Sequence, residues 1–248
     1  MARLDVIDLS HHNSVSSFAA VKSQGIVGVI HKCTEGRSIV DKMYESRKAH
    51  ALAAGLKWSS YHFLRPGDMQ GQMVHYVNIA KPVHGERMCL DYEISAVSIN
   101  DLCAAVQFLL DIGRNLQITI YSGHLLKEKL GDARNEFLRA NTSLWVAQYT
   151  TESPTWPTGT YATWSLWQYS DGSVGGTPRN VAGVTLPVDC NMFNGSRENL
   201  EKWFGPAGVE ESSVHIEITT KGAAKVFVSV DGNPLPDTFS TAFNLGDE

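Results

Sequence analysis

Two carboxylates at the end of an apolar segment are suited to acid–base chemistry. The run 88–90 precedes Asp91 and Glu93, and Tyr92 stands between them. If this run is a strand, Asp91 and Glu93 point the same way while Tyr92 points away. Neighbouring carboxylates cannot both ionise cheaply, so the pKa of one of them rises. A protonated acid beside an ionised partner is what hydrolysis of a glycosidic bond requires, although an acidic surface loop is the alternative interpretation.

Regularly spaced apolar segments predict the elements that hold this pair. We expect strands over residues 4–8, 26–31, 58–63, 88–91, 118–121, 144–149, 164–169 and 186–189. We expect helices over residues 18–22, 42–54, 69–80, 125–130 and 196–203, and another that begins near Ser98 or Asn100. Strands that alternate with helices indicate a parallel sheet, and eight of them indicate a closed α/β barrel of the TIM type. A loop rich in Pro, Thr and Gly replaces the helix between the sixth and seventh strands.

Further polar side chains fall at the ends of the predicted strands. They are Asp8, Asp91, Tyr121, Gln148, Gln168 and Asp189, with Glu93 just beyond the fourth strand. In such barrels the active site forms where the strands end. The sequence therefore predicts that six strands direct polar side chains to one mouth.

The outer acids also have plainer interpretations. Asp8 and Asp189 both precede Ser and Asn residues, a pattern typical of turns and helix caps. The pair His11 and His12 suggests a metal, but neighbours on a strand face opposite ways and no third ligand has suitable spacing. The sequence contains no nucleophile elbow, no GxGxxG and no GxxxxGK[ST] motif. We therefore expect neither a metal nor a cofactor.

The net charge is concentrated at the C-terminal end. The 248 residues have a formal charge of −5, and residues 209–248 account for all of it with seven acids against two bases. The remainder is neutral, which argues against a nucleic-acid partner. No apolar run approaches the ~18 residues of a membrane span, and no secretory signal is visible, so we expect no membrane insertion. Four scattered cysteines without a CxxC pair indicate reduced thiols.

Three segments are predicted along the chain. Residues 1–204 form the barrel, 205–208 a linker, and 209–248 a small β-rich element without an assigned role. Within that element, residues 214–218 and 225–230 alternate as strands do, and Asp231-Gly232 favours a turn. About 40 residues give a marginal core. We therefore expect this element to pack on the barrel or to mediate self-association.

Seven motifs, in order, resemble those of the family 25 glycoside hydrolases, the Chalaropsis-type lysozymes of bacteria, fungi and phages. They extend over roughly residues 3–204 and comprise Asp8-Leu9-Ser10-His11-His12, Lys32-x-Thr34-Glu35-Gly36, Tyr61-His62-Phe63, Asp91-Tyr92-Glu93, Trp145-x-x-Gln148-Tyr149, Trp167-Gln168-Tyr169 and Val188-Asp189-x-Asn191. The resemblance implies a (β/α)5β3 barrel. It also implies cleavage of the β-1,4 bond between N-acetylmuramic acid and N-acetylglucosamine in the glycan strands of peptidoglycan.

The resemblance also assigns roles to residues. Glu93 matches the general acid, Asp91 matches a carboxylate that assists the acetamido group of the substrate, and Asp8 and Asp189 match two further catalytic acids. The residues expected to bind substrate are Lys32, Glu35, Tyr61, Tyr121, Trp145, Gln148 and Gln168.

Other functions and settings stay open at this stage. A non-catalytic glycan-binding barrel of a phage particle would keep the aromatic residues without needing a proton donor. A chitinase is less favoured, because only Asp-x-Glu of the DxxDxDxE signature is present. The mechanism is retaining if the acetamido group attacks, and inverting if water attacks directly. With no signal visible, we expect an enzyme made in a host cytoplasm and released to the cell wall through a holin, or one whose leader was removed.

Overall fold

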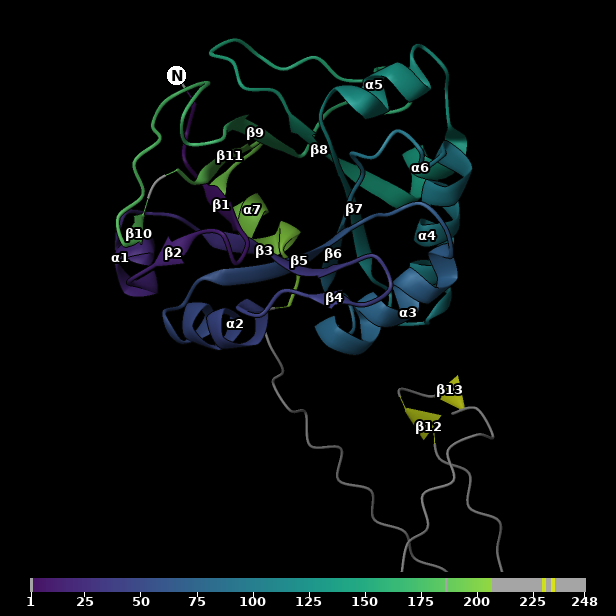
Figure 1. Cartoon of the computed structure of the whole chain (residues 1–248), viewed down its shortest axis with the longest axis horizontal. Coiled ribbons are helices and arrows are strands. Elements are labelled where there is room, and N and C mark those ends of the chain that lie inside the picture. Colours follow the sequence, from purple (N-terminus) through teal and green to yellow (C-terminus); the bar gives the residue numbers. More distant parts are fainter. Residues whose placement is uncertain (1, 186, 207–228, 231–232, 235–248) are drawn as a thin grey trace, which may run out of the picture. The chain divides into compact units, whose positions relative to one another are not determined.

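Eight strands of the chain close into a barrel (Figure 1). The computed structural model describes residues 2–185, 187–206, 229–230 and 233–234. The barrel strands, in spatial order, are β1 (Val6–Leu9), β11 (Asp189–Phe193), β9 (Leu166–Ser170), β8 (Thr142–Ala147), β7 (Gln117–Ser122), β6 (Arg87–Asp91), β5 (Lys57–Phe63) and β3 (Gly28–Glu35). Pairing of β1 with β3 closes the ring. The α/β barrel predicted from the sequence is confirmed.

The eighth strand of the barrel runs against the other seven. β11 pairs antiparallel with both β1 and β9, whereas the remaining pairs in the ring are parallel. The prediction of a parallel strand over residues 186–189 was therefore wrong in direction and position. The connection permits this direction, because residues 171–188 contain no helix in their described part. Neighbouring antiparallel strands can be joined by a loop, whereas parallel ones need a crossover.

Helices follow the first five barrel strands and surround the ring (Figure 1). They are α1 (Phe18–Ser23), α2 (Tyr44–Ala53), α3 (Met69–Ala80), α4 (Ile99–Asp111), α5 (His124–Leu130) and α6 (Glu136–Asn141). The last helix, α7 (Arg197–Trp203), follows β11 and packs against the inner side of the strands. Side chains cap the N-termini of several: Ser98 forms a capping box with Asp101 on α4, and Asp68 caps α3. The α6 helix was not predicted.

Two apolar layers hold the barrel together, one outside the strands and one inside. Alternate residues of β6 illustrate the division, since Met88 and Leu90 pack in the outer layer against the helices while Cys89 packs inside. The helix α7 contributes Leu200 and Trp203 to the inner layer, and Phe204, at its C-cap, joins them. A Cβ atom at Gly28 would lie 2.5 Å from the Phe204 ring, so only glycine lets this ring fill the end of the barrel.

Within the described part of residues 1–206, three short strands lie outside the ring. β4 (Ile39–Val40) extends the sheet beside β3, and β2 (Ser14–Val15) pairs with β10 (Val184–Thr185). None of the described helices has the length and hydropathy needed to cross a membrane.

The chain divides into two compact units, residues 1–210 and 211–248. In the second unit, β12 (Ser229–Val230) pairs antiparallel with β13 (Asn233–Pro234). The predicted strand over 214–218, most of the predicted strand over 225–230 and the turn at Asp231-Gly232 lie outside the described residues.

Candidate active site

A cavity of about 250 Å³ opens where the parallel strands end. It is lined by Asp8, Ser10, His12, Lys32, Tyr61, Phe63, Asp91, Glu93, Tyr121, Trp145, Tyr149, Gln168 and Asp189. These residues come from all eight barrel strands or from the loops that follow them. All of the polar side chains predicted to meet at one mouth, except Gln148, therefore line this cavity, and four of them are carboxyl groups.

Asp8 is fixed at the base of the cavity by two amide groups. Its side chain Oδ2 accepts hydrogen bonds from Gln168 Nε2 at 2.9 Å and from Asn191 Nδ2 at 2.8 Å. Burial raises the pKa of Asp8 to about 6; the two amide hydrogen bonds oppose the rise, and the nearby charge of Glu93 adds to it.

The two amides are themselves held in one orientation by aromatic residues. The hydroxyl groups of Tyr121 and Tyr149 donate to Gln168 Oε1 at 2.7 and 3.1 Å. The indole Nε1 of Trp145 donates to Asn191 Oδ1 at 2.7 Å. Because each amide oxygen is occupied by a donor, each amide nitrogen must face Asp8. The three aromatic residues therefore keep the amide N–H groups, rather than the amide oxygens, directed at the Asp8 carboxylate.

Asp91 and Glu93 form the second acidic pair. Asp91 is 6% exposed, and its Oδ1 atom is one of the few buried polar atoms without a partner in the described structure. Burial, followed by the charge of Glu93, raises the pKa of Asp91 well above its usual range, while Lys32 opposes the rise. Burial also raises the pKa of Glu93, whose side chain reaches the open mouth. Tyr92 points away and donates to Val97 O at 2.8 Å, as alternation requires.

Asp189 reaches the cavity from the first residue of the antiparallel strand. It lies opposite Asp8 in the pairing of β1 with β11. Burial, followed by the charge of Asp8, raises the pKa of Asp189 to about 9. Because the four acids are crowded together, some of their carboxyl groups stay protonated at neutral pH.

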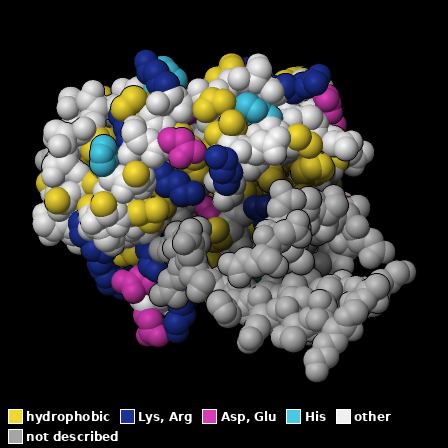
Figure 2. Space-filling model, turned by 90° about the horizontal axis from the view of Figure 1, so that it is seen from below, with side chains coloured by type: hydrophobic (Ala, Val, Ile, Leu, Met, Phe, Trp, Pro, Cys, Tyr) yellow, Lys and Arg dark blue, Asp and Glu magenta, His cyan; other side chains and the backbone are white. Residues whose placement is uncertain are grey.

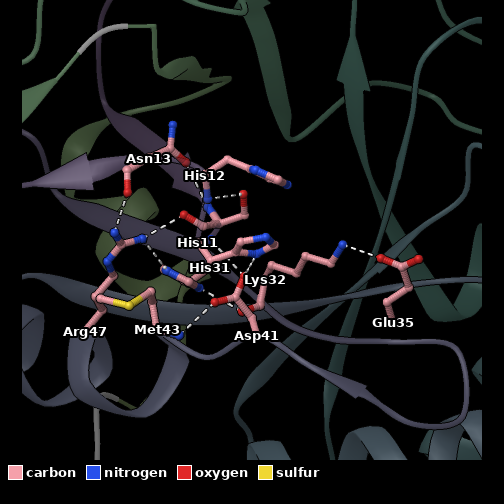
Figure 3. A network of polar contacts seen from close by, with 10 residues as sticks. His11, His12, Asn13, His31, Lys32, Glu35, Asp41, Met43 and Arg47 are labelled. Atoms are coloured by element: carbon pink, nitrogen blue, oxygen red, sulfur yellow. Dashed lines mark hydrogen bonds and ion pairs between the residues drawn. The ribbon is translucent and has the colours of Figure 1, made fainter.

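The loop after β1 is tied to the helix α2 (Figure 3). The Arg47 guanidinium donates to Ser10 O at 2.7 Å, to Asn13 O, and to the ring of His31. Asp41 accepts hydrogen bonds from both the backbone N–H and the Nδ1 atom of His11. These contacts fix the wall of the cavity to which Ser10 and His12 belong.

Lys32 is held over the cavity by a neighbouring acid. Its Nζ atom pairs with Glu35 Oε2 at 2.5 Å, and Arg65 pairs with the other oxygen of Glu35 (Lys32 and Glu35 in Figure 3). The Phe63 ring lies under both cations, 5.2 Å from Lys32 Nζ and 4.9 Å from Arg65 Cζ. Glu35 therefore orients Lys32 without lining the cavity itself.

Two residues predicted to bind substrate do not line the cavity. Glu35 is one, and Gln148 is the other. The Gln148 side chain accepts hydrogen bonds from Lys127 and Thr155, and its backbone bonds to Gln168 and Trp167. Trp145 and Ala147 are the inward-facing residues of β8, so the alternation turns Gln148 outward.

Four residues line the cavity that were not among the predicted site residues: Ser10, His12, Phe63 and Tyr149. Each stands inside or beside a motif that supplied a predicted residue, so motif position was the signal. Asn191 also stood in such a motif, but its bond to Asp8 follows only from the fold. Among the described residues, no group of three or more His, Cys, Asp or Glu side chains is arranged to hold a metal ion.

Known proteins are similar to this chain in sequence and in fold. The family model described as glycosyl hydrolases family 25 matches residues 7–177. Lysozyme M1 of Streptomyces globisporus is 28% identical over 214 aligned residues, and the match covers 78% of this chain and 69% of that protein. The autolytic lysozyme of Clostridium acetobutylicum is 30% identical, with 76% of this chain and 55% of that protein covered. The crystal structure of the bacterial lysozyme from Streptomyces coelicolor superposes with a TM-score of 0.69 at 26% identity, over 82% of this chain and 98% of that one.

These matches, together with the acid-lined barrel mouth, define the protein class. The chain belongs to family 25 of the glycosyl hydrolases. It is a glycoside hydrolase of the lysozyme type, and the family implies peptidoglycan as the substrate class.

Proposed function

We propose that the chain is an N-acetylmuramidase, which cleaves the β-1,4 bond between N-acetylmuramic acid and N-acetylglucosamine. The observation that carries this proposal is the division of labour between two adjacent acids. Asp91 is buried with an unpartnered oxygen, whereas Glu93 reaches the mouth where a glycan strand would lie.

Glu93 is the proposed general acid. Its raised pKa favours the protonated form, and its position at the mouth gives it access to a glycosidic oxygen. Because Asp91 lies beside it, the proton belongs to the pair in the free enzyme. Substrate binding then decides which of the two residues holds that proton.

Asp91 is the proposed partner of the substrate acetamido group. Its unpartnered Oδ1 atom accepts the acetamide N–H, and this hydrogen bond favours the ionised carboxylate. The proton of the pair then resides on Glu93, which delivers it to the leaving oxygen. The polarised acetamido oxygen attacks the anomeric carbon, and water later opens the cyclic intermediate with net retention, an exception to the two-carboxylate scheme.

Asp8 and Asp189 are proposed to stabilise positive charge that develops on the sugar ring. Asp8 is suited to this role, because two amide N–H donors favour its ionised form. Tyr149 is 43% exposed at the cavity and offers an aromatic face on which a sugar ring can stack. Release from a phage-infected host stays a prediction.

The experiment compares the wild type with Glu93→Gln on purified peptidoglycan. We expect turnover to fall at least ~100-fold, since a positioned general acid contributes about that much or more. Glu198→Gln, a change at an exposed carboxylate on α7, serves as the control and should retain full activity.

Mass spectrometry of the products tests the bond that is cleaved. Muramic acid at the new reducing ends supports the proposal, whereas glucosamine there redirects it to a glucosaminidase. Undiminished turnover by Glu93→Gln would exclude Glu93 as the proton donor. Binding of the glycan by the wild type without any turnover would favour the non-catalytic barrel instead.

A further inference from the structure

A second cavity lies at the opposite end of the barrel, where β7 and β8 begin. Its volume is about 360 Å³, and its polar lining consists of Arg87, Asn115, Gln117, Asn141, Thr142 and Ser143. Arg87 is the first residue of β6, so this cavity is separated from the acidic one by the length of the strands. The proposed glycosidase chemistry makes no use of it.

Arg87 is a buried cation without a carboxylate partner among the described residues. It is 6% exposed, and no ion pair involves it in the described part of the chain. Surface cations differ, because Lys202 pairs with Glu198 and Arg197 with Glu201 on α7. On the visible face in Figure 2, Lys and Arg side chains lie next to Asp and Glu in several places. Burying a charge is costly unless an opposite charge compensates it.

Neutral acceptors satisfy only some of the N–H donors of the Arg87 guanidinium. Nε donates to Trp203 O, while Nη1 donates to Thr119 Oγ1 at 2.8 Å and to Ser143 Oγ at 3.1 Å. The Trp203 ring lies 4.1 Å from Arg87 Cζ. Nη2 makes no hydrogen bond to any described residue, yet it is not among the fully enclosed polar atoms that lack a partner. Its two N–H groups are therefore open to the space that the cavity provides.

The rest of the lining favours a negative ligand. Arg87 is the one charged residue of the lining, and its polar neighbours are amides and hydroxyls that can donate hydrogen bonds. Hydrogen-bond donors that lie around one cation are suited to bind the oxygen atoms of a carboxylate or phosphate group.

We propose that this cavity binds a small oxygen anion of the carboxylate or phosphate class, with Arg87 as its counter-charge. Bound anion stabilises the folded chain by mass action, because the unfolded chain has no such cavity. The catalytic cavity does not compete for anions, since it gathers four acids.

Thermal unfolding of the full chain tests the proposal at fixed pH and ionic strength. Sodium phosphate and sodium acetate are titrated separately against sodium chloride. We expect a saturable rise of about 5 °C in Tm at roughly 100 times the dissociation constant for at least one of the two anions. A linear, unsaturated change in Tm with both anions, or no change with either, would overturn the proposal.

Two variants at the cavity and one control variant test whether the anion that raises Tm binds beside Arg87. Ser143→Asp places a carboxylate beside the guanidinium, so it should raise Tm without added anion and abolish the saturable response. Arg87→Gln should also abolish the response, and Lys42→Gln, an exposed change of equal charge, should retain it. If Arg87→Gln fails to fold, Ser143→Asp still decides. A lowered Tm in Ser143→Asp together with an intact response would refute the site.

Discussion

Replacement of Asp8 by asparagine should stabilise the fold at neutral pH. Burial is the largest cause that raises the pKa of this carboxyl from 3.8 to about 6. At about 1.4 kcal/mol per pH unit, that rise corresponds to roughly 3 kcal/mol against the ionised form in the folded chain. Asparagine carries no charge, and its oxygen can still accept the N–H groups of Gln168 and Asn191.

The sign of the pH dependence follows from the direction of the shift. A carboxyl whose folded pKa is raised contributes stability that is present below pH 3.8 and lost as the pH rises through 6. The advantage of Asp8→Asn should therefore be near zero at pH 4 and grow to about 1–3 kcal/mol at pH 7.5, allowing for the weaker amide acceptor. For a chain of this size, a gain of that magnitude in the free energy of unfolding raises Tm by about 5 °C.

Asp41 provides a matched control of opposite sign. It is buried like Asp8, but hydrogen bonds from the backbone N–H groups of Met43 and His11 outweigh burial and lower the pKa of its carboxyl. Its contribution to stability is present above the unfolded pKa and lost as the pH falls. Asp41→Asn should therefore destabilise the fold most at neutral pH.

The assay is denaturant or thermal unfolding of the three proteins at pH 4, 5.5 and 7.5. A lower Tm for Asp8→Asn than for the wild type at pH 7.5 would contradict the reasoning. So would an equal difference at all three pH values, because it would show that charge is not the cause.

Two further changes test the walls of the cavity. In Lys32→Met, loss of the cation that lowers the pKa of Asp91 should move the acidic limb of the kcat/KM profile to higher pH, while Lys42→Met leaves it in place. An unmoved limb would show that ionisation of Asp91 in the free enzyme does not set the acidic limb. Arg47→Met removes the donors that hold the loop after β1, so KM should rise several-fold more than kcat falls, with a stability loss of about 1–3 kcal/mol. Steady-state kinetics and melts measure both, and an unchanged KM would mean that the loop stays ordered without Arg47.

Local patterns in the sequence were sufficient to predict most of the fold. The helix over residues 69–80 was placed correctly, because its apolar spacing and the residues around it agree. The third strand was also placed to within a residue at its start. Strand β3 was predicted to end at His31 but continues to Glu35, since a bulge after Lys32 lets the chain stay paired with β5. A bulge depends on the partner strand, which the local pattern does not contain.

The site was predictable to the extent that strand ends define it. Nine of the eleven predicted site residues line the cavity, and Glu35 and Gln148 do not. The contacts that orient these residues could not be predicted from the sequence, because they join distant parts of the chain. Asn191 and Asp8 are 183 positions apart, and Gln168 and Asp8 are 160 apart. Only the closed ring brings such residues together.

The direction of β11 explains why the site prediction survived an error in topology. Asp189 was placed at the end of a parallel strand, yet it is the first residue of an antiparallel one. Both positions lie at the same rim, because an antiparallel strand begins where its parallel neighbours end. The reversal has a consequence for Asn191, which follows two residues later on the same face and so lies deeper in the barrel. There it meets both Asp8 and Trp145, whereas a parallel strand would have carried it past the rim into solvent.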